Sequence, residues 1–228
     1  MVVLTIIGVI ILILGCGFFM LRHNVLEEKH SYHLAFTAKA IASSCFFLLG
    51  LICALWCKDA YFKWVTPIAL GFGLVGDILL SMSQIKRKGS FFLLGGIAFA
   101  LEHYIHLMLM VSLKGATFFF GLAFLVLLGL MVIYLVKKYR VEAGKMAVGA
   151  ACYFVVLLLM CGIAFGTMLL SFTFGSLLFT LGALFFVASD TVLLLNKFGG
   201  LRQQRYSNLV MFTYYVAQVL IALSLLAR

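Results

Sequence analysis

The stretch "GFGLVGDILL", residues 71–80, places one carboxylate, Asp77, inside an apolar run that extends from residue 62 to residue 85. A membrane-spanning helix needs about 20 predominantly apolar residues, so this run is long enough to cross a bilayer. Acidic residues also interrupt apolar runs in "FALEHYIHLM", at Glu102, and in "FFVASDTVLLL", at Asp190. An ionisable group inside a span costs about 2.5–3.5 kcal/mol on insertion scales and usually faces the protein interior. These runs therefore predict membrane helices whose acidic residues point into a helix bundle.

The composition of the whole chain supports this interpretation. Its 228 residues are 65% hydrophobic and 11% charged, whereas about 25% of residues are charged in soluble domains. Continuous apolar runs and a single proline favour helices over a barrel, whose strands would alternate between apolar and polar residues. We therefore predict an all-α polytopic membrane bundle of eight transmembrane helices, forming a single domain over residues 1–228. The predicted spans are 2–21, 32–57, 62–85, 90–112, 116–136, 144–170, 174–197 and 207–227.

The net charge of +10 is explained by the distribution of basic residues between loops. The loops after the second, fourth and sixth spans hold only Lys58, Lys63 and Lys114. The loops after the odd-numbered spans hold twelve basic residues: Arg22, Lys29, Lys86, Arg87, Lys88, Lys137, Lys138, Arg140, Lys145, Lys197, Arg202 and Arg205. The positive-inside rule then predicts cytoplasmic odd loops and both termini outside. No nucleic acid partner is needed, and the short loops favour a bacterial inner membrane.

Depth in the membrane can be counted from the basic loops at ~1.5 Å per residue. Asp77 lies nine residues before Lys86, and Asp190 lies seven before Lys197. Both acids therefore fall in the half of the membrane next to the basic loops. The same count places further polar residues at this depth or deeper: Lys39, Tyr153, Tyr214, Gln218, Glu102 and His103. We expect polar groups from six spans to line one cavity that opens toward the cytoplasm.

In their order and spacing, these residues resemble the lysoplasmalogenase family of multi-pass membrane proteins, also called YhhN-like. The similarity runs from about Lys39 to the end of the chain. It includes "GLVGDILL" with Asp77, the pair His103 and Tyr104, "GALFFVASDTVLLLNKF" with Asp190, and "TYYVAQVLIALS" with Tyr214, Tyr215 and Gln218. Two positions depart from the family pattern: Ala40 replaces a frequent proline, and Glu102 stands where a small or apolar residue is expected.

The resemblance implies hydrolysis of the vinyl-ether bond of lysoplasmalogens to a fatty aldehyde and glycerophosphocholine or glycerophosphoethanolamine. The partners would be the lysophospholipid substrate and membrane lipids, with no cofactor and no metal. Protonating a vinyl ether creates an oxocarbenium-like cation, so the reaction needs one acid and one anion, as two carboxylates supply in glycosidases. We predict Asp190 as the acid, Asp77 as the stabilising carboxylate and His103 as an orienting group. Substrate binding is assigned to Lys39, Tyr153, Tyr214 and Gln218.

Structural roles are open for each of these groups. Asp77 and Asp190 would then only hydrogen-bond neighbouring helices, His103 would be a core histidine, and Lys39 would extend to the membrane interface. We interpret Tyr215 as structural, because it points to another side of its helix than Tyr214 does.

Two other functions are also open. In a metal-dependent lipid hydrolase, His103 and His106 would join Asp77 on zinc and Glu102 would act as a base. The alternative for Glu102 is a pairing with His106, one helical turn away. In a proton-coupled transporter, the buried Asp and His residues would relay protons. The oligomeric state is not predicted.

Overall fold

A computed structural model describes residues 2–111, 116–200 and 203–228. The described residues form eight α-helices and no strand, and all eight helices are long and apolar enough to span a membrane. The predicted fold class is therefore confirmed. The helices are α1 (Val2–Glu28), α2 (Tyr32–Trp56), α3 (Ala60–Lys86), α4 (Gly89–Val111), α5 (Ala116–Lys138), α6 (Ala147–Leu170), α7 (Phe174–Phe198) and α8 (Gln204–Ser224). Short 3₁₀ helices, η1 (Gly144–Met146) and η2 (Leu225–Ala227), precede α6 and follow α8.

Helix α1 is longer than the sequence predicted, because it continues past residue 21 to Glu28. Its polar end is stabilised by α2: the Nδ1 atom of buried His23 lies 2.9 Å from the carbonyl oxygen of Ala35. Arg22, which we had assigned to the first loop, is therefore part of α1. Two other loop cations, Lys114 and Arg202, lie outside the described residues.

Local sequence explains where several helices begin and end. The side chain of Asp59 accepts hydrogen bonds from the backbone N–H groups of Tyr61 and Phe62, which caps the start of α3. Thr173 and Ser176 form a reciprocal capping box at the start of α7. Two loops turn through residues with positive φ, His30 after α1 and Arg87 after α3. Such left-handed residues let the chain reverse direction within a few residues.

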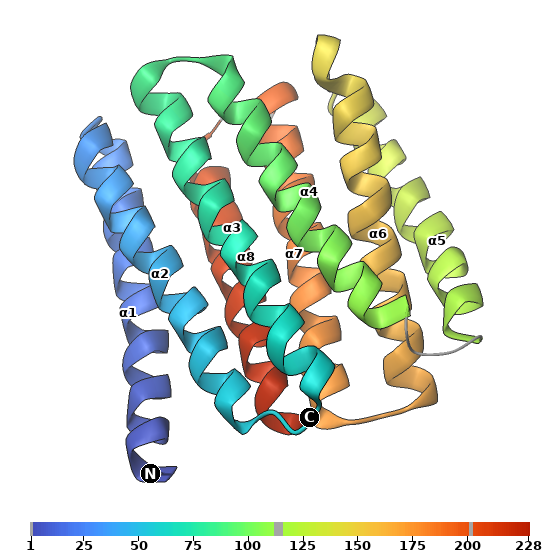
Figure 1. Cartoon of the computed structure of the whole chain (residues 1–228). Coiled ribbons are helices and arrows are strands. Elements are labelled where there is room, and N and C mark those ends of the chain that lie inside the picture. The colour runs from blue at the N-terminus through green and yellow to red at the C-terminus, as the bar shows by residue number, and fades with distance from the viewer. Residues whose placement is uncertain (1, 112–115, 201–202) are drawn as a thin grey trace.

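Six helices form a closed ring in the order α2, α3, α4, α6, α7 and α8, and α8 packs back against α2. Helix α1 packs outside the ring against α2 and α8, and α5 packs outside it mainly against α6. Figure 1 shows α1 and α5 at opposite margins of the bundle, with both chain termini at the same end. The interior of the ring is therefore enclosed by the six helices that carry the buried polar residues.

Helices α7 and α8 approach closely at Gly182. A Cβ atom at this position would lie 3.0 Å from the backbone oxygen of Ala217 and 2.8 Å from the side chain of Ile221. Small residues at helix interfaces allow such close packing in membranes. This contact fixes α8 beside α7, so that residues one to two turns from Gly182 on α7 share the ring interior with Tyr214.

Candidate functional site: two carboxylate groups inside the helix ring

Polar side chains from all six ring helices point into the ring interior. They comprise all the residues that we had predicted for the site and Glu102: Lys39 on α2, Asp77 on α3, Glu102 and His103 on α4, Tyr153 on α6, Asp190 on α7, and Tyr214 and Gln218 on α8. They form two hydrogen-bonded groups, which we call the Asp77 group and the Asp190 group after their carboxylates.

The Asp77 group surrounds a buried carboxylate with one cation and two hydroxyl donors. Oδ1 of Asp77 lies 3.1 Å from Nζ of Lys39. Oδ2 accepts hydrogen bonds from Ser43 Oγ at 2.6 Å and from Tyr214 OH at 2.7 Å. Only 2% of the Asp77 surface is exposed. A buried ion pair is tolerated only with good geometry and additional hydrogen bonds, and both are present here. Lys39 therefore does not extend to the membrane interface.

Two members of the Asp77 group were not identified from the sequence as site residues. The hydroxyl of Tyr215 lies 3.0 Å from Ser43 Oγ and donates to the backbone oxygen of Lys39 at 3.4 Å. Tyr215 therefore connects α8 to α2 within the site. A signal for Ser43 existed in the sequence, because it lies four residues after Lys39 and so shares its helical face.

The Asp190 group has a different composition. The Tyr153 hydroxyl donates to Asp190 Oδ2, and His103 Nε2 lies 2.8 Å from the same hydroxyl and 3.9 Å from Asp190 Oδ2. No Lys or Arg of the described chain contacts this carboxylate. The Asp190 side chain is 12% exposed, compared with 2% for the Asp77 side chain. The two carboxylates thus differ in both charge partners and access.

Glu102 extends the Asp77 group and lies next to the Asp190 group in sequence. Gln218 Nε2 donates to Glu102 Oε1 at 2.9 Å and to Tyr214 OH at 3.1 Å, so Glu102 is joined to the Asp77 group. Its sequence neighbour His103 belongs to the Asp190 group. The predicted pairing of Glu102 with His106 is wrong, since the His106 ring packs against Phe179 at 5.3 Å and its nitrogens have no hydrogen-bond partner among the described residues.

Space for Glu102 and Gln218 is provided by the lack of a side chain at Gly73 on α3. A Cβ atom there would lie 2.6 Å from Glu102 Oε2 and 2.7 Å from Gln218 Nε2. Glu102 is fully buried, and its Oε2 has no hydrogen-bond partner in the described part of the chain. A third carboxyl group therefore fits tightly beside the Asp77 group.

Aromatic rings pack against both groups. The Phe186 ring lies 4.7 Å from the His103 ring and 5.6 Å from the Tyr214 ring, measured between centroids, and both contacts are edge to face. Phe99 packs against the other side of the site, 5.7 Å from Tyr214. Phe186 thus contacts a member of each group, His103 in the Asp190 group and Tyr214 in the Asp77 group.

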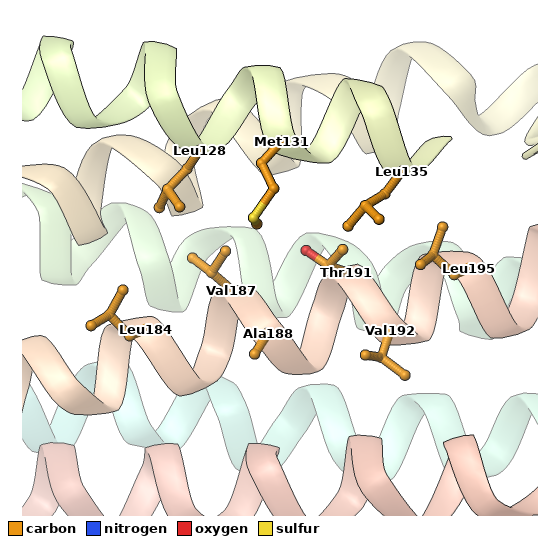
Figure 2. A pocket seen from close by; sticks show the side chains of 9 residues that line it. All are labelled: Leu128, Met131, Leu135, Leu184, Val187, Ala188, Thr191, Val192 and Leu195. Carbon is orange, nitrogen blue, oxygen red and sulfur yellow. The ribbon is translucent and has the colours of Figure 1, made fainter. Parts of the chain in front are cut away.

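A cavity lies on the outside of the ring, between α5 and α7 (Figure 2). Its volume is about 280 Å³, and Thr191 carries the one polar side chain in its lining: Leu128, Met131, Leu135, Leu184, Val187, Ala188, Thr191, Val192 and Leu195. Among the described residues, its lining is apolar except for Thr191 and includes no acid or base.

The zinc alternative lacks a suitable set of donors. Within residues 2–111, 116–200 and 203–228, no three His, Cys, Asp or Glu side chains lie together as metal ligands would. Asp77 and His103, which the alternative places on one ion, belong to different hydrogen-bonded groups.

Comparison with known families agrees with this arrangement. The family model of the YhhN family matches residues 34–225. The chain belongs to the YhhN family. The YhhN family includes lysoplasmalogenases. The matched range holds every residue of the Asp77 and Asp190 groups, and the whole of α1 precedes it. The chain matches no curated protein and no solved structure.

Proposed function

We propose that this YhhN protein is a lysoplasmalogenase, which hydrolyses the vinyl-ether bond of a lysoplasmalogen to a fatty aldehyde and a glycerophospho-alcohol. The observation that carries the proposal is the contrast between the two carboxylates of the ring. The Asp77 carboxylate pairs with the Lys39 ammonium group and accepts hydrogen bonds from two hydroxyl groups. The Asp190 carboxylate lies near a tyrosine hydroxyl and an imidazole, and its side chain is partly exposed. Pairs of carboxyl groups in unlike surroundings commonly divide into an acid and an anion.

The reaction then proceeds in three steps. Protonated Asp190 transfers its proton to the β-carbon of the vinyl ether, and the electron pair of the double bond forms the new C–H bond. The adjacent carbon becomes an oxocarbenium cation, which the Asp77 carboxylate stabilises. Water adds to this carbon and loses a proton to a carboxylate of the site. The hemiacetal collapses to the aldehyde as the glycerol oxygen takes up a proton, so one water is consumed.

The other polar residues are proposed to position these two carboxylates. Tyr153 hydrogen-bonds both Asp190 and His103, which links the acid to an imidazole that can return a proton to it. Tyr214, Ser43 and Lys39 fix Asp77. We had assigned Lys39, Tyr153, Tyr214 and Gln218 to the substrate. Each of these side chains also bonds a member of the two carboxylate groups, and we propose that further residues contribute to recognition of the head group.

We also propose that the odd-numbered loops face the cytoplasm, in a bacterial inner membrane. The excess of basic residues in these loops supports this orientation. Both termini, which lie at the other end of the bundle (Figure 1), would then be outside.

The purified protein in neutral detergent is expected to release fatty aldehyde from a 1-alkenyl lysophospholipid and none from its saturated 1-alkyl counterpart. The saturated ether has no double bond to protonate, so the acid step cannot occur. Mass spectrometry of the aldehyde and of the glycerophospho-alcohol measures both products. Movement of lipid across the membrane of proteoliposomes without release of aldehyde would show that the protein is a transporter and not a hydrolase. Equal cleavage of both lipids would exclude the vinyl-ether mechanism.

A further inference from the structure

A second, polar cavity lies at the end of the bundle that carries the basic loops. It has a volume of about 320 Å³ and forms where the α1–α2 loop, the end of α3 and the start of α8 meet. Its lining residues are Glu27, His30, Tyr32, Gln84, Arg87 and Gln204. Two loop residues with positive φ, His30 and Arg87, contribute to it. None of these six residues belongs to either carboxylate group.

The cavity lies over the Asp77 group, on the same helical faces. Tyr32 precedes Lys39 on α2 by seven residues, and Gln84 follows Asp77 on α3 by seven residues. Seven residues make almost two full helical turns, so both pairs share a face at a separation of about 10 Å. On α3, Ser81 lies between Asp77 and Gln84; it is buried, and its hydroxyl has no hydrogen-bond partner among the described residues. Ser81 is therefore a buried polar group on α3 between the cavity and Asp77.

Among the described residues, the cavity lining offers one free cation and one oriented anion. Arg87 makes no hydrogen bond or ion pair within the described part of the chain. The Glu27 carboxylate is held in place, because Oε1 accepts a hydrogen bond from Gln84 Nε2 at 2.9 Å and Oε2 lies 3.6 Å from His23 Nε2. Guanidinium groups bind phosphate through paired N–H donors, and a carboxylate binds an ammonium group. A lining with both charges suits a zwitterion better than a simple anion.

We propose that this cavity binds the zwitterionic head group of the lysolipid, with the phosphate on Arg87 and a primary ammonium group on Glu27. The inference rests on the proposed function and specifies its substrate as an ethanolamine lysolipid. A choline head group has no N–H to donate to Glu27. Quaternary ammonium groups are typically recognised by several aromatic rings, and the cavity lining has one, Tyr32.

The length of the lipid agrees with this placement. Six bonds separate the phosphorus atom from the first carbon of the vinyl ether, which corresponds to about 7 Å in an extended chain. Arg87 follows Asp77 by ten residues, which is almost three helical turns or about 15 Å, and the extended Arg87 side chain would cover the distance that the lipid backbone leaves. The carbon that becomes cationic would thus lie next to Asp77, and the β-carbon one bond further along, toward Asp190.

The test uses a saturated 1-alkyl lysophosphatidylethanolamine, which binds without being cleaved. Its dissociation constant is measured with purified full-length protein in neutral detergent. Arg87→Gln is expected to raise this constant at least tenfold. The matched control Lys86→Gln, which removes an adjacent exposed cation outside the cavity lining, is expected to leave it unchanged. Neither variant should alter the binding of a 1-alkyl glycerol that lacks the phosphate.

Glu27→Gln tests the ammonium contact. The wild-type protein is expected to bind the ethanolamine lysolipid several-fold more tightly than the choline lysolipid, and the variant should lose this preference. Thermal unfolding of each variant identifies any loss of fold, and Arg87→Gln tests the phosphate contact independently at an exposed position.

Failure of this inference can be distinguished from failure of the proposed function. If Arg87→Gln and Lys86→Gln have equal effects, or if Glu27→Gln keeps the head-group preference, the cavity is not the head-group site, whether or not aldehyde is released. If binding depends on Arg87 and Glu27 while the wild-type protein releases no aldehyde, the cavity proposal holds and the hydrolase proposal fails.

Discussion

Replacing Asp190 with Asn is expected to lower kcat for aldehyde release by about 10²–10⁴-fold, the usual contribution of a positioned general acid. An amide still accepts the hydrogen bond from Tyr153 but has no carboxyl proton to give to the β-carbon. The variant Asp77→Asn is expected to show a loss of similar size, because the neutral amide cannot stabilise the oxocarbenium cation. Both effects should fall on kcat with a small change in KM, because the two groups act mainly on the transition state.

The matched control is Asp59→Asn, which changes an acid at the start of α3, outside the ring. Asn caps helices about as well as Asp, so this variant should retain wild-type activity. Aldehyde release by the three purified variants is measured under saturating lysoplasmalogen, with thermal unfolding as a check on fold. Near-wild-type turnover by both Asp77→Asn and Asp190→Asn would show that the carboxylates have only structural roles.

The variant Lys39→Met is expected to destabilise the protein by about 3–5 kcal/mol, the usual effect of removing one partner of a buried ion pair. The reason is that Asp77 would stay buried with two hydroxyl donors and no cation. Adding Asp77→Asn should restore most of the lost stability, because the remaining charge is also removed. The double variant should stay inactive, since it lacks the stabilising carboxylate.

The free energy of unfolding of the wild type, both single variants and the double variant forms a double-mutant cycle. Lys63→Met serves as the control, because Lys63 lies at the start of α3 and its ammonium group lies over the Trp64 ring. The ion pair is not a coupled unit if Lys39→Met is as stable as the wild type. The same conclusion follows if the free energy of unfolding that the double variant loses equals the sum of the losses in the two single variants.

Much of the fold followed from the sequence, because the membrane restricts spanning segments to long apolar helices. The runs predicted the number and type of the helices that the described residues form, and the helix periods indicated which acids point inward. The end of α1 was missed because its last two turns are polar. These turns are stabilised by packing on α2, as the contact between His23 and Ala35 shows. The hydrophobic periodicity of α1 alone does not predict this contact.

Less of the site than of the fold could be predicted from the sequence. Counting residues from the basic loops gave the common depth of Asp77 and Asp190, but it could not give the order of helices around the ring. That order decides that Gln218, and not His106, reaches Glu102, and that Tyr215 can contact Ser43 on α2. It also places Phe186 in contact with a member of each carboxylate group. Partners of buried polar groups depend on such neighbours from distant segments.

Hydrolysis of a lysoplasmalogen in ²H₂O tests the central claim most directly. If a carboxylic acid of the ring protonates the β-carbon, the released aldehyde must carry one deuterium at its second carbon, and Asp190→Asn must suppress the labelled product. Mass spectrometry of the aldehyde measures both. An aldehyde that is unlabelled or oxidised at that carbon, or labelled aldehyde released at the wild-type rate by Asp190→Asn, would contradict the account.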